Sequence, residues 1–218
     1  MQPSYKAFLF DLNGTMINDM DYHITAWHRI LNQLGASISW EQMKHECYGK
    51  NHELLERTFP GRFTDTEKDR MSYEKEEAYQ EAFRPYLELI EGLELFLKQA
   101  HDAGIVMAIG SAAILFNIDF VLDGLNIRPY FKALVSADHV SRSKPDPETY
   151  LTCARLLGVA PEDCLVFEDT PKGVESARNA GMDCVVIRGM HGEEEFEQFG
   201  NVLQMQPNFN GLWEKLKR

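Results

Sequence analysis

Five short runs of continuous apolar residues constrain the fold most strongly, because they do not alternate with polar residues as half-exposed strands do. Such runs are typical of parallel strands that are covered on both faces. The runs are Ala7–Phe10, Val106–Ile109, Ala133–Val135, Leu165–Phe167 and Cys184–Ile187. Helical spacing separates the last four, at Leu93–Ala100, Phe120–Ile127, Tyr150–Leu157 and Val174–Ala180. Repeated strand–helix units predict an α/β fold with a doubly wound, Rossmann-like parallel sheet.

The interval between the first two predicted strands differs from the rest of the chain. Residues 16 to about 84 contain no convincing strand and are too many for a plain crossover. Apolar residues at helical spacing predict one helix from Ile24 to Leu34. The capping-box pair Ser39 and Gln42 predicts the start of a second helix, and Thr64 the start of a third. We therefore expect an inserted α-helical cap domain.

The composition of this 218-residue chain bounds its domains and its partners. A hydrophobic content of 44% is ample for the core of one domain with a smaller insert. We place the core domain at residues 1–16 and 85–218 and the cap domain at residues 17–84. The formal net charge of −12 argues against nucleic-acid binding, which needs a basic surface. The charge is compatible with a small phosphorylated metabolite as ligand.

No segment predicts export or membrane insertion. The first residues lead directly into the first predicted strand, so we expect no signal peptide. The longest apolar run, Val106 to Phe116, is well short of the about 20 residues that a membrane helix needs. The four cysteines form no close pair, and Cys164 and Cys184 open apolar runs as buried thiols do. We expect a cytoplasmic monomer without structural disulfides and without membrane contact.

Polar residues follow the strands at the edge where an open α/β sheet binds its ligands. They are Asp11, Ser111, Lys144, Glu168 and Asp169. A carboxylate can attack phosphorus, a hydroxyl can bind phosphate oxygens, a lysine can neutralise charge, and further carboxylates can hold a hard cation. Each group alone has a simpler interpretation as a turn or a helix cap. Their occurrence at four successive strand ends predicts a site for phosphoryl chemistry.

The motifs around these residues resemble those of the haloacid dehalogenase superfamily of phosphotransferases across nearly the whole chain. The motifs are Asp11-Leu12-Asn13-Gly14-Thr15, a segment ending in Ser111, Ser143-Lys144-Pro145-Asp146-Pro147, and Phe167-Glu168-Asp169-Thr170-Pro171-Lys172-Gly173-Val174. Their order, with the helical insert after the first motif, resembles the subgroup that contains beta-phosphoglucomutase and sugar-phosphate phosphatases.

This resemblance implies a Mg²⁺-dependent phosphatase or phosphomutase acting on small phosphomonoesters. It implies that Asp11 is the nucleophile and forms an aspartyl-phosphate. It also implies two groups of site residues. The phosphoryl group would be bound by Ser111, Ala112 and Lys144, and the metal by Asp11, the backbone carbonyl of Asn13, Glu168 and Asp169.

In the cap, the resemblance places His23 and Trp27 over the active site and His52 in a loop that reads the substrate. Simpler interpretations apply to each residue. Trp27 lies on an apolar stripe typical of a core, and His23 lies one helical turn before it, where a hydrogen-bonded structural role is an alternative. The alternative for His52 and Lys75 is that they are solvated residues on charged helices, and we expect this of Lys75.

Asn13 departs from the family pattern, because phosphotransferases of this family have an acid/base carboxylate two residues after the nucleophile. An amide cannot transfer the proton, and general acid–base catalysis is commonly worth about 10²–10⁴-fold. Three explanations remain open. Asn13 is an engineered replacement, as in a beta-phosphoglucomutase variant; or it is native, and His23 or water supplies the proton; or the protein binds a phosphorylated ligand with little turnover. Ala113-Ile114, in place of a polar residue and a lysine, further weakens a mutase assignment.

Two other classes share part of the pattern. A receiver-type signalling domain also combines an aspartate, a lysine and acidic metal ligands, but in another order, on a shorter chain and without a cap. A dehalogenase would tolerate loss of the second carboxylate, yet Glu168-Asp169 suits magnesium better than carbon–halogen chemistry. We therefore favour a phosphotransferase.

Overall fold

The computed structural model describes residues 3–217, which fall into two compact units. The core unit comprises the chain up to Asn18 and from Glu88 onward. The helical unit comprises Asp19–Leu87.

A six-stranded parallel sheet forms the centre of the core unit, with strand order β3-β2-β1-β4-β5-β6. The strands are β1 (Ala7–Phe10), β2 (Val106–Gly110), β3 (Phe131–Val135), β4 (Cys164–Glu168), β5 (Asp183–Ile187) and β6 (Val202–Gln206). Strand β1 pairs with both β2 and β4. The residues that follow these three strands therefore lie next to one another at the carboxyl edge of the sheet, where ligands bind in such folds.

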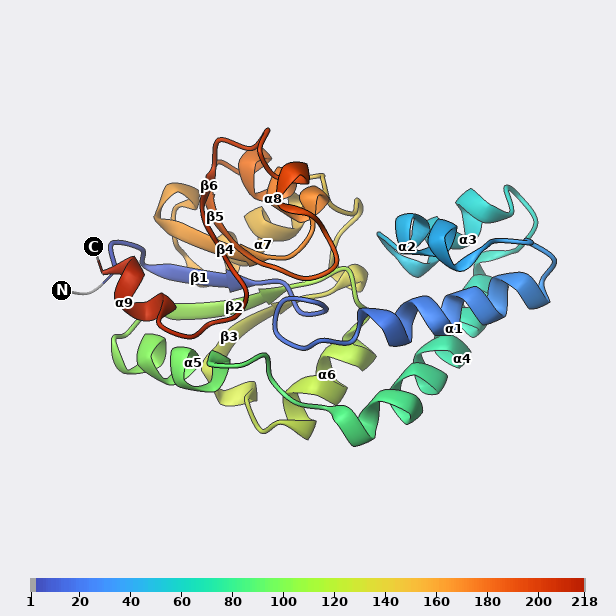
Figure 1. Ribbon diagram of the computed structural model, residues 1–218, viewed down its shortest axis with the longest axis horizontal. Helices are drawn as coiled ribbons and strands as arrows, with labels where there is room; N and C mark the ends of the chain where they lie inside the picture. Colours follow the sequence, from blue (N-terminus) through green and yellow to red (C-terminus); the bar gives the residue numbers. More distant parts are fainter. Residues whose placement is uncertain (1–2, 218) are drawn as a thin grey trace. The chain divides into compact units, whose positions relative to one another are not determined.

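Helices cover both faces of this sheet, as Figure 1 shows. One face carries α5 (Leu93–Asp102), α6 (Leu115–Gly124) and α9 (Leu212–Leu216), and the other carries α7 (Glu148–Leu157) and α8 (Pro171–Asn179). Short 3₁₀ turns complete the connections: η2 (Arg128–Tyr130), η3 (Ala137–His139), η4 (Pro161–Asp163) and η5 (Glu193–Glu195). The arrangement confirms the predicted doubly wound α/β fold.

Burial on both faces explains why the strand sequences do not alternate. Every residue of β1 and β4 is buried. On one face, aromatic rings pack together, with ring centroids 4.6 Å apart for Phe10 and Phe167 and 5.5 Å for Phe8 and Phe96. Such pairs add about 0.5–1.5 kcal/mol to the free energy of area burial. The central strands are thereby held rigidly under the carboxyl edge.

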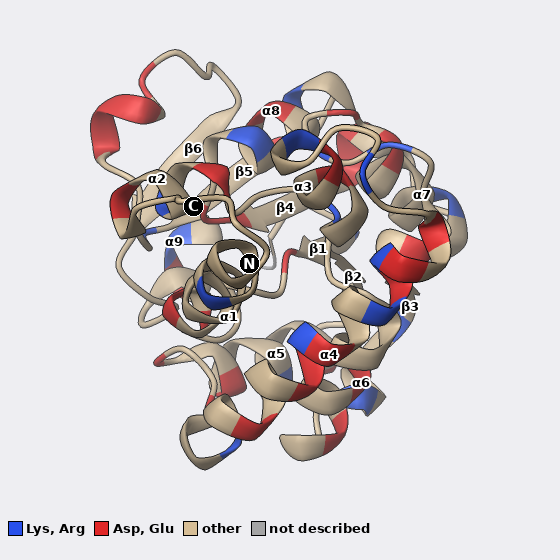
Figure 2. Ribbon diagram, turned by 90° about the vertical axis from the view of Figure 1, so that its right-hand side faces the viewer, with Lys and Arg blue, Asp and Glu red and all other residues tan. Residues whose placement is uncertain are grey.

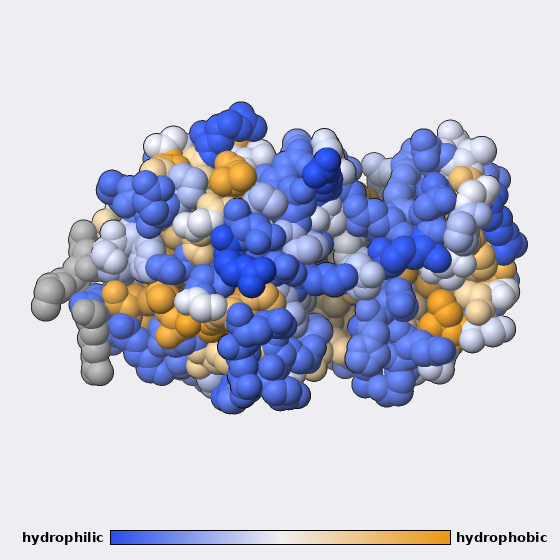
Figure 3. Space-filling model, turned by 90° about the horizontal axis from the view of Figure 1, so that it is seen from above, coloured by the Kyte–Doolittle hydropathy of each residue, from blue (hydrophilic) through white to orange (hydrophobic). Residues whose placement is uncertain are grey.

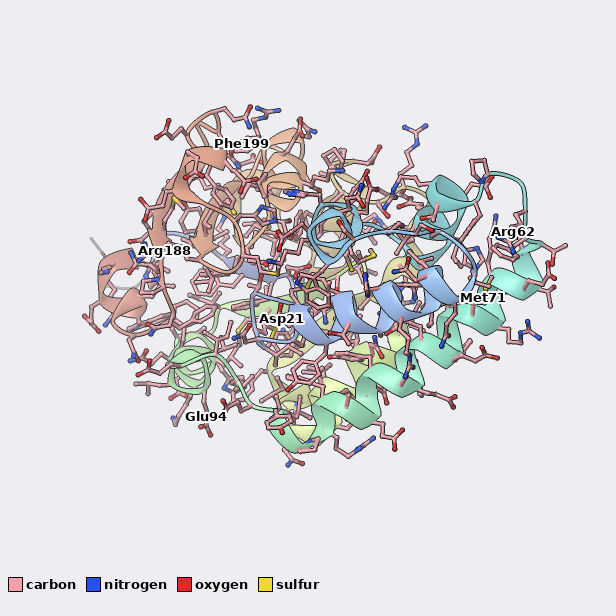
Figure 4. All side chains as sticks on the ribbon, turned by 45° about the vertical axis from the view of Figure 1, so that its right-hand side comes forward. Asp21, Arg62, Met71, Glu94, Arg188 and Phe199 are labelled. Atoms are coloured by element: carbon pink, nitrogen blue, oxygen red, sulfur yellow. The ribbon has the colours of Figure 1, made fainter. Side chains whose placement is uncertain are left out.

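The sequence prediction failed at the sheet's far edge and at one helix end. Strand β6 was not predicted, because two glutamines interrupt its apolar sequence. It lies at the edge of the sheet, pairs only with β5, and none of its residues is fully buried. The segment before it packs Phe196 and Phe199 into the core, and Phe199 is labelled in Figure 4. Helix α6 ends at Gly124, so the predicted helical end at Ile127 is wrong by three residues.

The helical unit consists of α1 (Met20–Gln33), α2 (Trp40–Glu46), α3 (Asn51–Thr58), α4 (Asp65–Phe83) and the 3₁₀ turn η1 (Arg84–Tyr86). Capping boxes at Ser39 and Thr64 start α2 and α4, which confirms both predicted starts. Helix α3 was not predicted because its N-cap residue is Lys50, which lacks the short polar side chain that marks the starts of α2 and α4. The buried core of this unit includes Trp27 and Met71, the latter labelled in Figure 4.

The surface is polar and mixed in charge. Acidic and basic segments are interspersed along the helices in Figure 2. The face seen in Figure 3 is mostly hydrophilic with small separate apolar patches. Within residues 3–217, the helices lack the combination of length and apolar character needed to cross a membrane. The four cysteines are free thiols, and Cys164 and Cys184 are buried as predicted.

Candidate active site

Three buried carboxylates meet at the carboxyl edge of the sheet. Asp11 directly follows β1, Glu168 is the last residue of β4, and Asp169 comes next. One carboxylate oxygen from each lies within 4.8 Å of the other two. The Asp11 backbone N–H donates to the Phe167 carbonyl at 3.0 Å, which continues the β1–β4 pairing into the site. The pairing of these two strands is therefore what brings the distant motifs together.

The electrostatics of this cluster favour a cation. Burial and the negative charges of Glu168 and Asp11 raise the pKa of Asp169 well above its usual range. The Thr15 hydroxyl donates to Asp169 Oδ1 at 3.1 Å and opposes this shift only in part. Carboxylate oxygens are the ligands that Mg²⁺ prefers in proteins. The donor set therefore fits a hard divalent cation.

Lys144 lies between two of the carboxylates. Its Nζ is 2.6 Å from Asp11 Oδ1 and 2.6 Å from Glu168 Oε1. Burial lowers the pKa of Lys144, but the charges of Asp11 and Glu168 outweigh burial and raise it above its usual range. Burial likewise raises the pKa of Glu168, and the Lys144 charge outweighs it, so that pKa is lowered. Lys144 thus supplies a fixed positive charge beside Asp11.

Glu168 is held by hydrogen bonds to both of its oxygens. Oε1 accepts from Lys144 and from the Tyr150 hydroxyl at 2.7 Å. Oε2 accepts from the backbone N–H groups of Asp169 and Thr170 and from the Thr170 hydroxyl, at 3.0–3.2 Å. A Cβ on Gly173 would lie 1.8 Å from Glu168 Cδ. The glycine of the fourth motif therefore leaves room for this carboxylate.

Ser111 and Ala112 follow β2 on the other side of β1. Ser111 is 1% exposed, and its backbone N–H donates to the Val135 carbonyl at 2.9 Å. Its hydroxyl oxygen accepts from the Ala113 N–H at 3.1 Å. Ser111 is therefore a cap within its own loop and not the N-cap of α6, which is Ile114. Ala112 is half-buried at the next position.

Asn13 and Gly14 form a tight turn after β1. Asn13 is half-buried and forms an isolated bridge with Ile17, and the Gly14 N–H donates to the Ile17 carbonyl at 2.9 Å. Gly14 has a φ of +78°, and a Cβ there would lie 2.1 Å from Asp169 Oδ2. The second strand that a hairpin would require is absent, since the sequence continues into α1. Gly14 thus allows the turn to approach the acidic cluster.

Gly14→Ala is expected to destabilise the protein more than Gly104→Ala. Gly104 has nearly the same φ, +76°, but open space around its Cβ position. Gly104→Ala should lower the free energy of unfolding by about 1–2 kcal/mol, the cost of a left-handed conformation. Gly14→Ala should lower the free energy of unfolding by a further amount of about 1–3 kcal/mol, because its Cβ would be overpacked against Asp169. Urea unfolding of both variants measures the difference, and equal losses would contradict the close approach.

A buried chain of hydrogen bonds runs through the helical unit. His23 Nε2 lies 3.2 Å from Asp19 Oδ2, and His23 Nδ1 lies 2.5 Å from Lys75 Nζ. Lys75 also donates to Glu76 at 2.8 Å. The Tyr79 hydroxyl donates to Asp19 at 2.5 Å, and the ring of Tyr79 stacks on His23 with centroids 3.8 Å apart. These contacts tie α1 to α4.

The predicted site residues of the helical unit differ in exposure. Lys75 is 2% exposed, so the expectation of a solvated lysine is wrong, because Glu76 and His23 supply it with buried partners. Trp27 is 2% exposed and packs in the core, as its apolar stripe indicated. His52 lies near the surface, where Nε2 is 2.8 Å from Asp69 Oδ1. His23 is hydrogen-bonded and buried.

Several residues of these two networks were not singled out by sequence reasoning. Thr15 and Tyr150 contact the acidic cluster, and Asp19, Glu76 and Tyr79 complete the buried chain. Tyr150 was assigned to an apolar helical stripe, which is correct for its ring but says nothing of its hydroxyl. Thr15 lies within the first motif, so that motif was the one available signal.

Glu76→Gln is expected to make the stability of the helical unit less dependent on pH in the acid range. Burial raises the pKa of Glu76, but the Lys75 charge outweighs it and lowers the pKa from 4.5 to about 2. A lowered pKa means that the stabilisation is fully present above pH 4.5 and is lost as pH falls through about 2. The shift corresponds to roughly 3 kcal/mol. Circular dichroism between pH 5 and 2 tests this, with exposed Glu74→Gln as the matched control.

The sequence between residues 8 and 187 matches the haloacid dehalogenase-like hydrolase family. Together with the fold and the clustered carboxylates and lysine, this shows that the chain belongs to that family. It is 32% identical over 190 residues to fructose-1-phosphate phosphatase YqaB of Escherichia coli (strain K12), covering 86% of this chain and 99% of the relative. It is 30% identical over 189 residues to beta-phosphoglucomutase of Bacillus subtilis (strain 168), covering 84% and 83%.

Solved structures show the same fold. Beta-phosphoglucomutase from Clostridium difficile superposes with a TM-score of 0.83 at 26% identity, covering 98% of this chain and 96% of that one. The predicted family resemblance is thereby confirmed. The protein is an enzyme of the haloacid dehalogenase-like phosphatase and phosphoglucomutase type.

Proposed function

We propose that this enzyme is a Mg²⁺-dependent phosphatase of small sugar phosphates that works through an aspartyl-phosphate on Asp11. The observation that carries the proposal is the position of Lys144, whose Nζ bridges Asp11 and Glu168 beside Asp169. A carboxylate that attacks a phosphate dianion needs nearby positive charge, which this lysine supplies. The names of the relatives, a fructose-1-phosphate phosphatase and a beta-phosphoglucomutase, support sugar phosphates as the substrate class.

In the first step, an Asp11 carboxylate oxygen attacks phosphorus and the bond from phosphorus to the sugar oxygen breaks. The sugar oxygen takes a proton from water and leaves as the alcohol. In the second step, water attacks the aspartyl-phosphate, releases inorganic phosphate and regenerates Asp11. Lys144 balances the phosphoryl charge in both steps, and Ser111 with Ala112 would line the phosphate position. The family resemblance suggests these assignments, and the positions of Asp11 and Ser111 after their strands and the contact between Lys144 and Asp11 support them.

The metal would be held by Asp11, Asp169 and the backbone carbonyl of Asn13, with Glu168 as the neighbouring carboxylate. When bound, Mg²⁺ would offset the negative charge of the phosphoryl group and of the acidic cluster. Burial and then the negative charges of Glu168 and Asp11 raise the pKa of Asp169 when no metal is bound. A cation would relieve the repulsion between these carboxylates.

Asn13 favours a phosphatase over a mutase. A mutase must protonate a leaving oxygen and then activate the same sugar as acceptor, and an amide does neither. Hydrolysis needs only water as the acceptor, so slow turnover survives the loss of the carboxylate. Asn13 also supports a second candidate function, in which the protein binds a phosphorylated ligand with little turnover. We further propose that the helical unit is the substrate-selecting cap, with His23 and His52 as its candidate contacts.

The test is phosphate release from a panel of phosphomonoesters with Mg²⁺ and with chelator. The panel includes fructose 1-phosphate, and beta-glucose 1-phosphate with a bisphosphate primer. We expect release that requires Mg²⁺ and no isomerised sugar phosphate. Tight ligand binding without release, in the wild type and in Asn13→Asp alike, would contradict catalysis and support the binding function.

A further inference from the structure

The hydrogen bonds that hold the Glu168 carboxylate include one from a residue outside the sequence motifs, Tyr150 of α7. Tyr150 is fully buried, at 0% exposure. Its hydroxyl donates to Glu168 Oε1 at 2.7 Å, the same oxygen that accepts from Lys144 at 2.6 Å. The Lys144 Nζ lies 4.7 Å from the centroid of the Tyr150 ring. One side chain therefore contacts both members of the ion pair next to Asp11.

These two contacts affect how the Lys144 ammonium is held between Asp11 and Glu168. Its ammonium is held by two carboxylates at equal distances, 2.6 Å from Asp11 and 2.6 Å from Glu168. The Tyr150 hydroxyl donates to Glu168 and so reduces the negative charge that its Oε1 presents to Lys144. The ring of Tyr150 adds a cation–π contact to the Lys144 ammonium. Without the hydroxyl, Glu168 would draw Lys144 more strongly away from Asp11.

We propose that Tyr150 is a positioning residue of the phosphoryl-transfer site, which acts through Glu168 to keep the Lys144 ammonium at Asp11. The proposal rests on the function proposed above, because it assigns Lys144 to the phosphoryl group. Packing alone does not require the hydroxyl, since phenylalanine would fill nearly the same space. The hydroxyl is thus the part of Tyr150 that serves the site.

The test begins with Tyr150→Phe, which removes the hydroxyl and keeps the ring. We expect kcat/KM for phosphate release to fall by about tenfold to a hundredfold, as for loss of a hydrogen bond to a charged group. Tyr150→Leu also removes the ring and should be slower still. Tyr5→Phe is the matched control, because its hydroxyl donates to the Asp183 carboxylate at 2.5 Å at the opposite edge of the sheet. It should leave kcat/KM unchanged.

A double-mutant cycle separates positioning from packing. If Tyr150 acts through Glu168, adding Tyr150→Phe to Glu168→Gln should cost less than about threefold in kcat/KM. Losses that multiply would overturn the proposal, because Tyr150 would then act independently of Glu168. A lower thermal midpoint with unchanged kcat/KM in Tyr150→Phe would also overturn it, since the role would be structural.

Binding of inorganic phosphate in the presence of Mg²⁺, measured by calorimetry, gives a readout that does not need turnover. Tyr150→Phe should weaken this binding by about threefold or more, because Lys144 would be displaced. Wild-type binding without turnover, weakened by Tyr150→Phe, would contradict the proposed function and leave this inference standing. Turnover and binding that are both insensitive to Tyr150→Phe would overturn the inference and leave the proposed function standing.

Discussion

Asp11→Asn is expected to reduce phosphate release by at least about 10⁴-fold, as the loss of a covalent nucleophile does in other enzymes. Asp11 stands at the end of β1 with Lys144 at 2.6 Å, in a cluster with Glu168 and Asp169. An amide at this position forms no acyl phosphate under these conditions, and it also removes one ligand of the proposed metal. Steady-state release from the best substrate of the panel measures the effect.

The control for this variant is Asp163→Asn. Asp163 lies just before β4, at the amino edge of the sheet, and pairs with Lys6 at 2.6 Å. The substitution is chemically identical but lies away from the proposed chemistry, so turnover should be unchanged. Acid-quenched protein incubated with labelled substrate should carry label in the wild type and none in Asp11→Asn. Near-normal phosphate release by Asp11→Asn would mean that water attacks phosphorus directly, and it would contradict the proposed aspartyl-phosphate.

Asn13→Asp is expected to raise kcat by about 10²–10⁴-fold, the usual contribution of a positioned general acid and base. Asn13 is half-buried in the turn that leads from β1 to Gly14, two residues after Asp11. A carboxyl there could protonate the leaving oxygen and then activate water. The gain should be greatest for substrates with poor leaving groups, because those need the proton most.

The matched control is Asn126→Asp, which adds the same charge at an exposed position between α6 and η2. Asn126 has a φ of +56°, a conformation that aspartate tolerates. It should leave kcat unchanged. If Asn13→Asp brings no gain while the wild type turns over, the proton comes from water or from another residue such as His23. A gain accompanied by isomerisation of beta-glucose 1-phosphate would instead support a mutase ancestry for this site.

Much of the fold followed from local patterns, and the exceptions have physical reasons. Residues 7–10 were predicted as a strand with the observed bounds, because a strand buried on both faces has an uninterrupted apolar sequence. Strand β6 was missed because an edge strand is only partly buried and its glutamines break that pattern. Lys75 was misjudged because helical spacing says nothing of the partners that other helices bring, here His23 and Glu76.

Some features of the candidate site could also be predicted from the sequence, and others could not. Its charged members could be identified in advance, since Asp11, Lys144, Glu168 and Asp169 stand at or after strand ends, and parallel strands end at one edge. Their mutual geometry could not, because it depends on which strands are neighbours. The order β2-β1-β4 places the turn after Asp11 against Asp169, which leaves no room for a Cβ at Gly14. Tyr150 is the clearest case, since its sequence position indicates a core residue while its hydroxyl reaches Glu168.

The sequence by itself determined the strand–helix order, the helical insertion, the family motifs and the absence of a carboxyl group at Asn13, because each of these is a property of local residue order. Only the tertiary structure decided that Lys144 is shared between Asp11 and Glu168, that Tyr150 and Thr15 support the acidic cluster, and that Lys75 is buried. These facts arise from contacts between segments far apart in the chain. They depend on strand neighbours and helix packing, which no local pattern encodes.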